Sequence, residues 1–147
     1  IADRKHLLAA LLNLVYRCKG PDKISLSTDA LFAAAADYPE GKLIKQKNGM
    51  ETLLEDGVMK LPDRQAFSGS IATTSRLVHN MIELAGADLV SAVKMATCTP
   101  ARVIHADDRK GRIAVGYDAD LIVIDDQINV YKTIVMGNTV FTNSSDS

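Results

Sequence analysis

Asp29 is the carboxylate best placed in the sequence to take part in chemistry. It ends a short alternating run, residues 23–30, in which Ile24 and Leu26 would point to one side of a strand. In sheets built from strand-then-helix units, chemistry gathers at the carboxyl ends of the strands, because the loops there vary while the strands hold position. The structural alternative is that Asp29 only caps a helix, since the alanine-rich residues 31–36 can be helical and an Asp just before a helix is a good N-cap.

A second candidate group is the hydroxyl and glycine cluster Phe67-Ser68-Gly69-Ser70, which leads into a predicted helix. The unpaired N–H groups and partial positive charge of a helix N-terminus can bind an anion or a polar ligand. The alternative is that Ser68 or Ser70 merely caps the helix. The residues alone leave both interpretations open.

The histidines and cysteines lack the spacing of a metal site. His6, His79 and His105 are scattered, unlike the pairs of a His-x-x-x-His or Cys-x-x-Cys pattern. His6 stands out because it follows a charged start that could itself be the end of a preceding strand. Cys18 and Cys98 lie far apart with no secretory context, which predicts reduced core thiols in a cytosolic protein.

The elements that would position these groups alternate between helix and strand. Residues 7–16 are apolar on nearly every side, which predicts a helix packed between a sheet and other helices, ended at Gly20. Residues 42–66 predict short strands with turns at Asn48-Gly49 and Asp56-Gly57. We interpret them as an irregular β excursion that borders the mouth of a site.

Helices are predicted again from Ile71 to Gly86 and from Asp88 onward, and the pattern then changes to strands. The predicted strands are short and bounded by turn residues: 111–116, 120–125, 130–136 and 139–142. The chain thus divides into an α/β body, residues 1–108, and a small β domain, residues 109–143. Residues 144–147 form a tail that we expect to fray.

Composition excludes several classes of protein. The chain has 147 residues, 47% of them hydrophobic, which is enough for a core. Its formal net charge is −1 and the charges are mixed, so neither a nucleic-acid groove nor an acidic interaction tail is indicated. No apolar run reaches membrane-spanning length. The chain opens without a methionine and in mid-pattern, which suggests that an upstream part is missing.

Five segments together carry a resemblance to a known family, in order and at compatible spacing. They are Asp3-x-x-His6-Leu7, Ser27-Thr28-Asp29-Ala30, Phe67-Ser68-Gly69-Ser70, Met95-Ala96-Thr97-x-x-Pro100-Ala101-Arg102 and Lys110-Gly111-Arg112-Ile113-Ala114-x-Gly116-x-Asp118-Ala119-Asp120-Leu121. The last two resemble amidohydrolases in general. The first three, with Asn129-Val130-x-x-Thr133-Ile134-Val135-x-Gly137-Asn138, resemble the C-terminal part of the N-acetylglucosamine-6-phosphate deacetylase family.

The resemblance implies a fold and a set of site residues. The fold would be the C-terminal portion of a metal-dependent (β/α)8 barrel followed by part of a small β-sandwich domain, with Asp29 ending the last barrel strand. Asp29 would be the catalytic acid/base, taking a proton from the metal-bound water that attacks the acetamide carbonyl and passing it to the departing amine. The substrate site would be lined by two segments: Asp3, Arg4, Lys5 and His6, and then Phe67, Ser68 and Gly69.

The implied reaction converts N-acetylglucosamine 6-phosphate to glucosamine 6-phosphate and acetate in the cytoplasm. The implied cofactor is a divalent metal, expected to be zinc, whose ligands lie upstream of this chain. The chain alone would then be inactive, with exposed apolar helix faces and unpaired strand edges, and the complete protein a homodimer. The alternatives are another amidohydrolase, such as a cyclic-amide hydrolase, and a non-catalytic remnant or interaction module in which Asp29 is only a helix cap.

The chain departs from the family pattern at two positions. Arg4 stands where the family usually has glycine, and a bulky cation there could either assist a phosphate or obstruct the site. His105 also occupies a position that is often glycine, where we expect an effect on a turn only.

Overall fold

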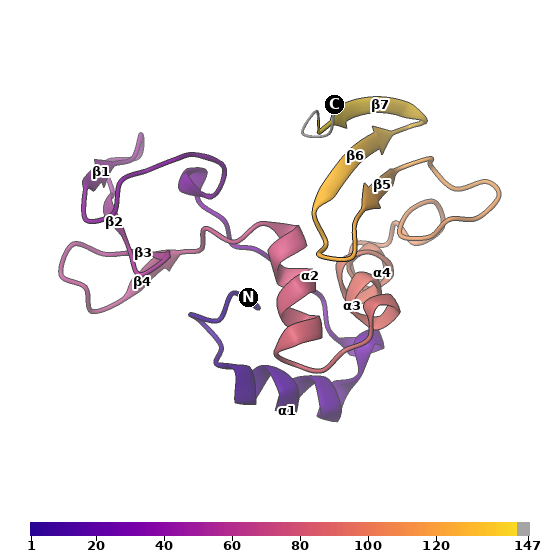
Figure 1. Ribbon diagram of the computed structural model, residues 1–147, viewed down its shortest axis with the longest axis horizontal. Coiled ribbons are helices and arrows are strands. Elements are labelled where there is room, and N and C mark those ends of the chain that lie inside the picture. Colours follow the sequence, from indigo (N-terminus) through magenta and orange to yellow (C-terminus); the bar gives the residue numbers. More distant parts are fainter. Residues whose placement is uncertain (144–147) are drawn as a thin grey trace.

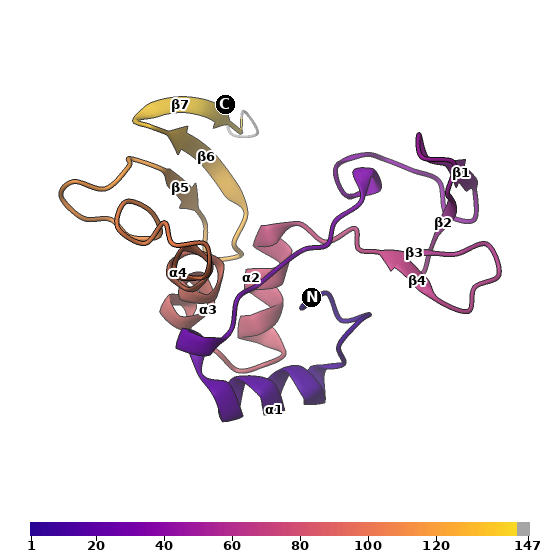
Figure 2. The ribbon, with the colours of Figure 1, turned by 180° about the vertical axis from the view of Figure 1, so that it is seen from behind.

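The computed structural model describes residues 1–143, in which a group of helices separates two sheets (Figures 1 and 2). The predicted tail, residues 144–147, lies outside the described residues. The helices are α1 (Ala9–Lys19), η1 (Pro21–Lys23), η2 (Phe32–Ala35), α2 (Thr74–Glu83), α3 (Leu89–Ala96) and α4 (Cys98–Val103). The strands are β1 (Leu43–Lys45), β2 (Glu51–Glu55), β3 (Val58–Lys60), β4 (Phe67–Gly69), β5 (Leu121–Ile124), β6 (Val130–Val135) and β7 (Asn138–Thr142).

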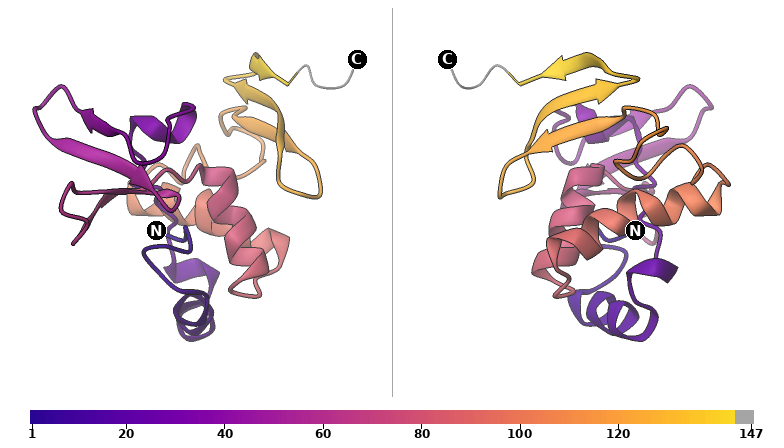
Figure 3. Two further views of the ribbon diagram at one scale, coloured as in Figure 1. Left: turned by 60° about the vertical axis from the view of Figure 1, so that its left-hand side comes forward. Right: turned by 90° about the vertical axis from the view of Figure 1, so that its right-hand side faces the viewer.

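Helix α2 is the centre of the main core. Its buried side chains Leu77, Val78 and Met81 recur at helical spacing and form one apolar face. That face packs with Leu12 of α1 and Met95 of α3 in a single cluster. The packing explains why α2 lies among the other helices in every view of the molecule (Figures 1 and 3). In the described residues, no helix is long and apolar enough to cross a membrane.

The segment before Asp29 is extended but is not a regular strand, contrary to the prediction. The predicted alternation is present in the burial, since Ile24 and Leu26 pack against the main core while the residues between them are exposed. A strand also needs a hydrogen-bonded ladder with a neighbour. Here the segment makes one backbone bond, from the Leu26 N–H to the Met95 carbonyl, and one parallel bridge, between Ala30 and Ser70.

Helix α1 forms where predicted and ends at Gly20, but it is not packed on every side. Leu12 is its buried residue, whereas Leu11 and Leu14 are exposed, Leu14 by 57%. The exposed apolar helix face expected of a fragment is therefore present in this structure. Cys18, predicted to be a core thiol, is also exposed on this helix.

The predicted β excursion is confirmed and proves longer than expected. It is an antiparallel sheet in the order β1-β2-β3-β4, with turns at the predicted Asn48-Gly49 and Asp56-Gly57. Asp56 and Gly57 both have positive φ, 56° and 70°, as this tight hairpin turn requires. The sheet has its own small core, in which Leu54 and Met59 pack against Ala33 of η2.

The sheet continues into Phe67–Gly69, so the helix start predicted there is wrong. These residues are β4, paired with β3, and α2 begins only at Thr74. Its N-cap is Thr73, whose hydroxyl accepts a bond from the Arg76 N–H. Ser68 and Ser70 therefore do not cap a helix, and the anion-binding helix terminus proposed for them is absent.

The second sheet has the order β5-β6-β7, and all its pairs are antiparallel. A strand predicted at 111–116 does not form. Ion pairs from Lys110 to Asp118 and Asp120 instead close residues 109–120 into a loop. The described residues thus form a mixed α/β fragment with two antiparallel sheets and no closed barrel within 1–143 (Figure 3).

The two departures from the family pattern share one backbone feature. Arg4 has φ 70° and His105 has φ 56°, in the left-handed region that favours glycine. A residue with a side chain in this region destabilises the folded backbone by about 1–2 kcal/mol relative to the right-handed region. The glycine that the resemblance leads us to expect at both positions would avoid this strain.

Candidate active site

The first group of site residues is a tight turn organised by the Asp3 carboxylate. One of its oxygens, Oδ1, accepts bonds from the backbone N–H groups of Lys5 and His6, both at 2.9 Å. The other, Oδ2, lies 2.7 Å from His6 Nδ1. Asp3 is only 4% exposed, and both of its oxygens are occupied within the turn.

Helix α2 anchors this turn to the main core. The buried Asn80 side chain donates from Nδ2 to the carbonyl of Ala2, at 2.7 Å. A buried amide in the middle of an apolar helix face needs such a partner. Sequence reasoning missed Asn80, although a polar residue next to the apolar stripe of Val78 and Met81 was the available signal.

The charge state of Asp3 determines how His6 presents its ring. Burial alone would raise the pKa of Asp3, but the N–H groups of His6 and Lys5 and the His6 ring together lower it below its ordinary value. An ionised carboxylate only accepts hydrogen bonds, so Nδ1 of His6 carries the proton. Nε2 is then the ring nitrogen left to face a ligand. Arg4 and Lys5 are both exposed beside it.

The aromatic ring of Phe67 joins β4 to this turn. It meets the His6 ring edge-on, with the ring centroids 5.0 Å apart. A β-bulge follows, because Lys60 pairs with Phe67 while Met59 pairs with Gly69, leaving Ser68 as the extra residue. The Ser68 hydroxyl is buried and has no hydrogen-bond partner among residues 1–143.

The second group lies at the other end of β4, around Asp29. Its backbone carbonyl accepts from the Ser70 N–H at 3.0 Å, and the Leu31 N–H donates to the Ser70 carbonyl at 2.9 Å. Gly69 lies against both, since an added Cβ would fall 2.7 Å from Leu31 Cγ and 3.3 Å from the Asp29 oxygen. One strand therefore contacts the His6 turn at its start and the Asp29 segment at its end.

The alternative in which Asp29 caps a helix is wrong. The short helix η2 begins at Phe32, its N-cap is Leu31, and no side chain hydrogen-bonds to that end. The Asp29 side chain is exposed and makes no hydrogen bond or ion pair within the described part of the chain. Its carboxylate is thus free to meet a ligand.

The residues present do not make a metal site. No group of three or more His, Cys, Asp or Glu side chains that could hold a metal ion gathers within residues 1–143. One ring nitrogen of His6 is already hydrogen-bonded to Asp3. Asp29 could add one carboxylate to ligands supplied from elsewhere, which is fewer than a metal centre needs.

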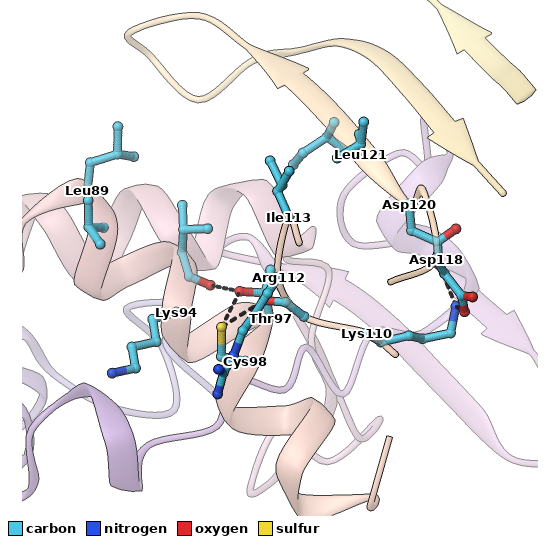
Figure 4. Close-up of a pocket in the computed structure, with 14 residues that line it drawn as sticks. Leu89, Lys94, Thr97, Cys98, Lys110, Arg112, Ile113, Asp118, Asp120 and Leu121 are labelled. Atoms are coloured by element: carbon cyan, nitrogen blue, oxygen red, sulfur yellow. Dashed lines mark hydrogen bonds and ion pairs between the residues drawn. The ribbon is translucent and has the colours of Figure 1, made fainter. Parts of the chain in front are cut away.

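A separate apolar groove of about 450 Å³ lies between α3 and the loop that precedes β5 (Figure 4). Cys98 lines it and lies 2.7 Å, through Sγ, from the Gly111 carbonyl that accepts its S–H. Leu89, Ile113 and Leu121 give the groove its apolar character. None of the predicted site residues line it.

Comparisons with known proteins agree with the predicted resemblance. A sequence model described as the amidohydrolase family matches residues 18–140. The N-acetylglucosamine-6-phosphate deacetylase of Lysinibacillus sphaericus is 31% identical over 93% of this chain and 34% of its own length. The N-acetylgalactosamine-6-phosphate deacetylase of Escherichia coli O157:H7 is 30% identical over 93% of this chain and 35% of its own.

A solved structure extends the likeness to the fold. The crystal structure of the N-acetylglucosamine-6-phosphate deacetylase from Thermotoga maritima matches with a TM-score of 0.84 and 32% identity, over 97% of this chain and 38% of that one. The resemblance expected from the sequence is confirmed. The chain spans about a third of the length of the two relatives named above.

Proposed function

We propose that this chain, which belongs to the amidohydrolase family, supplies the proton-carrying carboxylate and one wall of the substrate site of a deacetylase. The complete enzyme would hydrolyse N-acetylglucosamine 6-phosphate to glucosamine 6-phosphate and acetate. The observation that carries the proposal is the double contact of β4, which meets His6 through Phe67 and the Asp29 segment through Gly69. The proposal is also supported by two deacetylases that are about 30% identical to nearly the whole chain.

Asp29 is assigned the acid/base step. Its carboxylate accepts a proton from the attacking water and returns it to the nitrogen of the departing amine, so one group serves both halves of the reaction. Its exposure and its freedom from other hydrogen bonds suit a group that must exchange protons with substrate.

The turn at the start of the chain is assigned to the sugar phosphate. The Nε2 atom of His6 can accept from a sugar hydroxyl when the ring is neutral and donate to a phosphate oxygen when the ring is protonated, since Asp3 holds the other ring nitrogen. Arg4 and Lys5 add exposed positive charge, which favours an anion. Phe67, Ser68 and Gly69 form the adjacent wall, in which the Ser68 hydroxyl is buried without a partner among residues 1–143.

The rest of the catalytic machinery is proposed to lie in the part of the protein beyond this chain. A divalent metal, expected to be zinc, would polarise the amide carbonyl when bound. Its ligands, the remaining barrel and sandwich strands, a homodimeric assembly and a cytoplasmic location belong to the same proposal. This chain alone is expected to be inactive.

The test compares the complete protein with its Asp29→Asn variant for amine release from N-acetylglucosamine 6-phosphate in the presence of zinc. We expect the variant to lose roughly 10²–10⁴-fold in rate, the usual contribution of a positioned acid or base. Asp37→Asn is the matched control, because Asp37 is another exposed carboxylate close to Asp29 in the sequence. Equal rates for all three proteins would exclude Asp29 as the proton carrier.

A second substrate deserves the same assay, since one relative is named for the galactosamine isomer at nearly the same identity. The two sugars differ in the orientation of a single hydroxyl, so the ratio of their kcat/KM values decides between them. A cyclic-amide hydrolase would act without a phosphate on its substrate. A non-catalytic remnant would release no amine and bind no metal.

A further inference from the structure

The backbone of Asp29 is held in an unusual conformation. Its φ is 47°, in the left-handed region that non-glycine residues seldom adopt. Such conformations persist where the surrounding structure imposes them, and they gather at functional sites. Since the carboxylate has no partner within residues 1–143, the backbone, which sets the Cα–Cβ vector, is what places it.

Two backbone hydrogen bonds to Ser70 impose that conformation. They flank Ala30 and form the parallel bridge, with the Ser70 N–H bonded to the Asp29 carbonyl and the Ser70 carbonyl bonded to the Leu31 N–H. Ser70 is itself completely buried, and its hydroxyl accepts from the Ala72 N–H at 2.9 Å. The bridge is therefore anchored on the β4 side.

A side chain at residue 69 would press on both residues that flank the bridge. A Cβ there would lie 2.7 Å and 2.9 Å from two atoms of the Leu31 side chain and 3.3 Å from the Asp29 carbonyl oxygen. Contacts under 3 Å force a neighbour to move. The neighbours that would move are the two residues on either side of the bridge, Asp29 and Leu31.

We propose that Gly69 is a positioning residue for Asp29: its missing side chain lets Leu31 and the Asp29 carbonyl close the Ser70 bridge that aims the carboxylate. The inference rests on the proposed function, because it assumes that Asp29 carries the proton. It adds a role for Gly69 that differs from lining the substrate pocket. A lining residue would act on substrate binding, whereas a positioning residue acts on the proton transfer.

The first experiment is Gly69→Ala in the complete protein, assayed with N-acetylglucosamine 6-phosphate. We expect kcat to fall by about 10²-fold, the usual effect of a shift of about 1 Å in a catalytic group, with KM changed far less. Leu31→Ala removes the two atoms that the new Cβ would strike, so the double variant should recover part of the lost kcat; the rest of the loss reflects the φ of 150° at residue 69. Gly41→Ala is the matched control: Gly41 also has positive φ, 76°, but no atom lies within 4 Å of its added Cβ.

The second experiment separates positioning from a general loss of structure. In an Asp29→Asn background the carboxylate is gone, so Gly69→Ala should cause little further loss of kcat. A full further loss, or a loss confined to KM, would overturn the inference and assign Gly69 to substrate binding or to folding.

Hydrogen exchange tests the bridge without any assay of activity. Gly69→Ala should speed the exchange of the Ser70 and Leu31 amides, and Gly41→Ala should not. Unchanged exchange would overturn the inference even if the enzyme is active. If the unsubstituted protein releases no amine, the proposed function fails, and the catalytic part of this inference fails with it, while the exchange rates still decide whether Gly69 holds the bridge.

Discussion

The two antiparallel sheets of this chain differ in how far their apolar side chains are covered. In β1–β4, Leu54 and Met59 are buried against η2, and Met59 is 0% exposed. In β5–β7, Ile122, Val140 and Phe141 stay exposed, by 57%, 61% and 48%. Both sheets are antiparallel throughout and each contains a register shift, so hydrogen bonding does not explain the difference.

This difference indicates that a sheet holds site residues in fixed positions only when another layer packs on its apolar face. The β1–β4 sheet has such a layer in η2 and holds the two halves of the candidate site through its last strand. The β5–β7 sheet reaches the main core mainly through Ile124 and the nearby Ile128. Much of its apolar surface is left for another surface to cover, which agrees with the expected tendency of this chain to associate.

The largest expected effect is on stability, in the covered sheet. Met59→Ala should lower the free energy of unfolding by about 2–5 kcal/mol, because it opens a cavity in a filled core. Val140→Ala, the matched change in the open sheet, should alter it by less than about 0.5 kcal/mol. Denaturant unfolding of the chain measures both values. Similar losses for the two variants would mean that the open sheet is covered in solution.

The next prediction compares a buried carboxylate near the site, Asp3, with a half-buried one near the open sheet, Asp118. Asp3→Asn should cost about 1–3 kcal/mol near neutral pH, because it breaks hydrogen bonds to a buried charge. Asp118→Asn should cost less, since its partners Arg109 and Lys110 are solvent-accessible.

Acid should weaken the contributions of both carboxylates to stability, and salt should distinguish them. The pKa of each is lowered on folding: in Asp3 burial opposes the hydrogen bonds of the turn, which prevail, and in Asp118 the bond from Lys110 dominates. Each contribution is therefore present above the ordinary carboxyl pKa near 4 and is lost as the pH falls through the lowered value. Added salt should weaken the Asp118 contribution and leave that of Asp3 nearly unchanged. Unfolding curves at several pH values and salt concentrations test this, and equal salt sensitivity would contradict it.

A smaller effect concerns two of the positions with left-handed backbone, Arg4 and His105, one in each half of the chain. Arg4→Gly should stabilise the fold by up to about 1 kcal/mol through relief of left-handed strain, less the entropy that a glycine adds to the unfolded chain. His105→Gly should do the same, since its φ is similar. In the complete enzyme, only Arg4→Gly should also change KM for a phosphorylated substrate. A change in KM from His105→Gly would contradict the placement of the site.

Changes to the exposed loop before β5 should have the smallest effect on stability and the largest effect on self-association. Ile113 and Val115 in the loop before β5 are 89% and 105% exposed. Their replacement by serine should change the unfolding free energy by less than about 0.5 kcal/mol. Light scattering should show less self-association, with Lys47→Ser in the covered sheet as a control without effect. Unchanged association would contradict this prediction and indicate that another surface, such as the exposed leucines of α1, mediates it.

The sequence by itself determined the local features of this protein. The alternation at Ile24 and Leu26, the hairpin turns at Asn48-Gly49 and Asp56-Gly57, and the helix start at Asp88 all form as predicted, because each depends on neighbouring residues or on a fixed backbone preference. The motif resemblance that placed the chain near the deacetylases was likewise present in the residues.

Only the tertiary structure decided which of several local options each site residue takes. Asp29 could cap a helix or end a strand, and contact with Ser70, forty-one positions away in the sequence, gives it a strained turn instead. Phe67–Gly69 could start a helix, but pairing with β3 makes it a strand. These choices depend on hydrogen bonds and packing between distant segments, which no local pattern encodes.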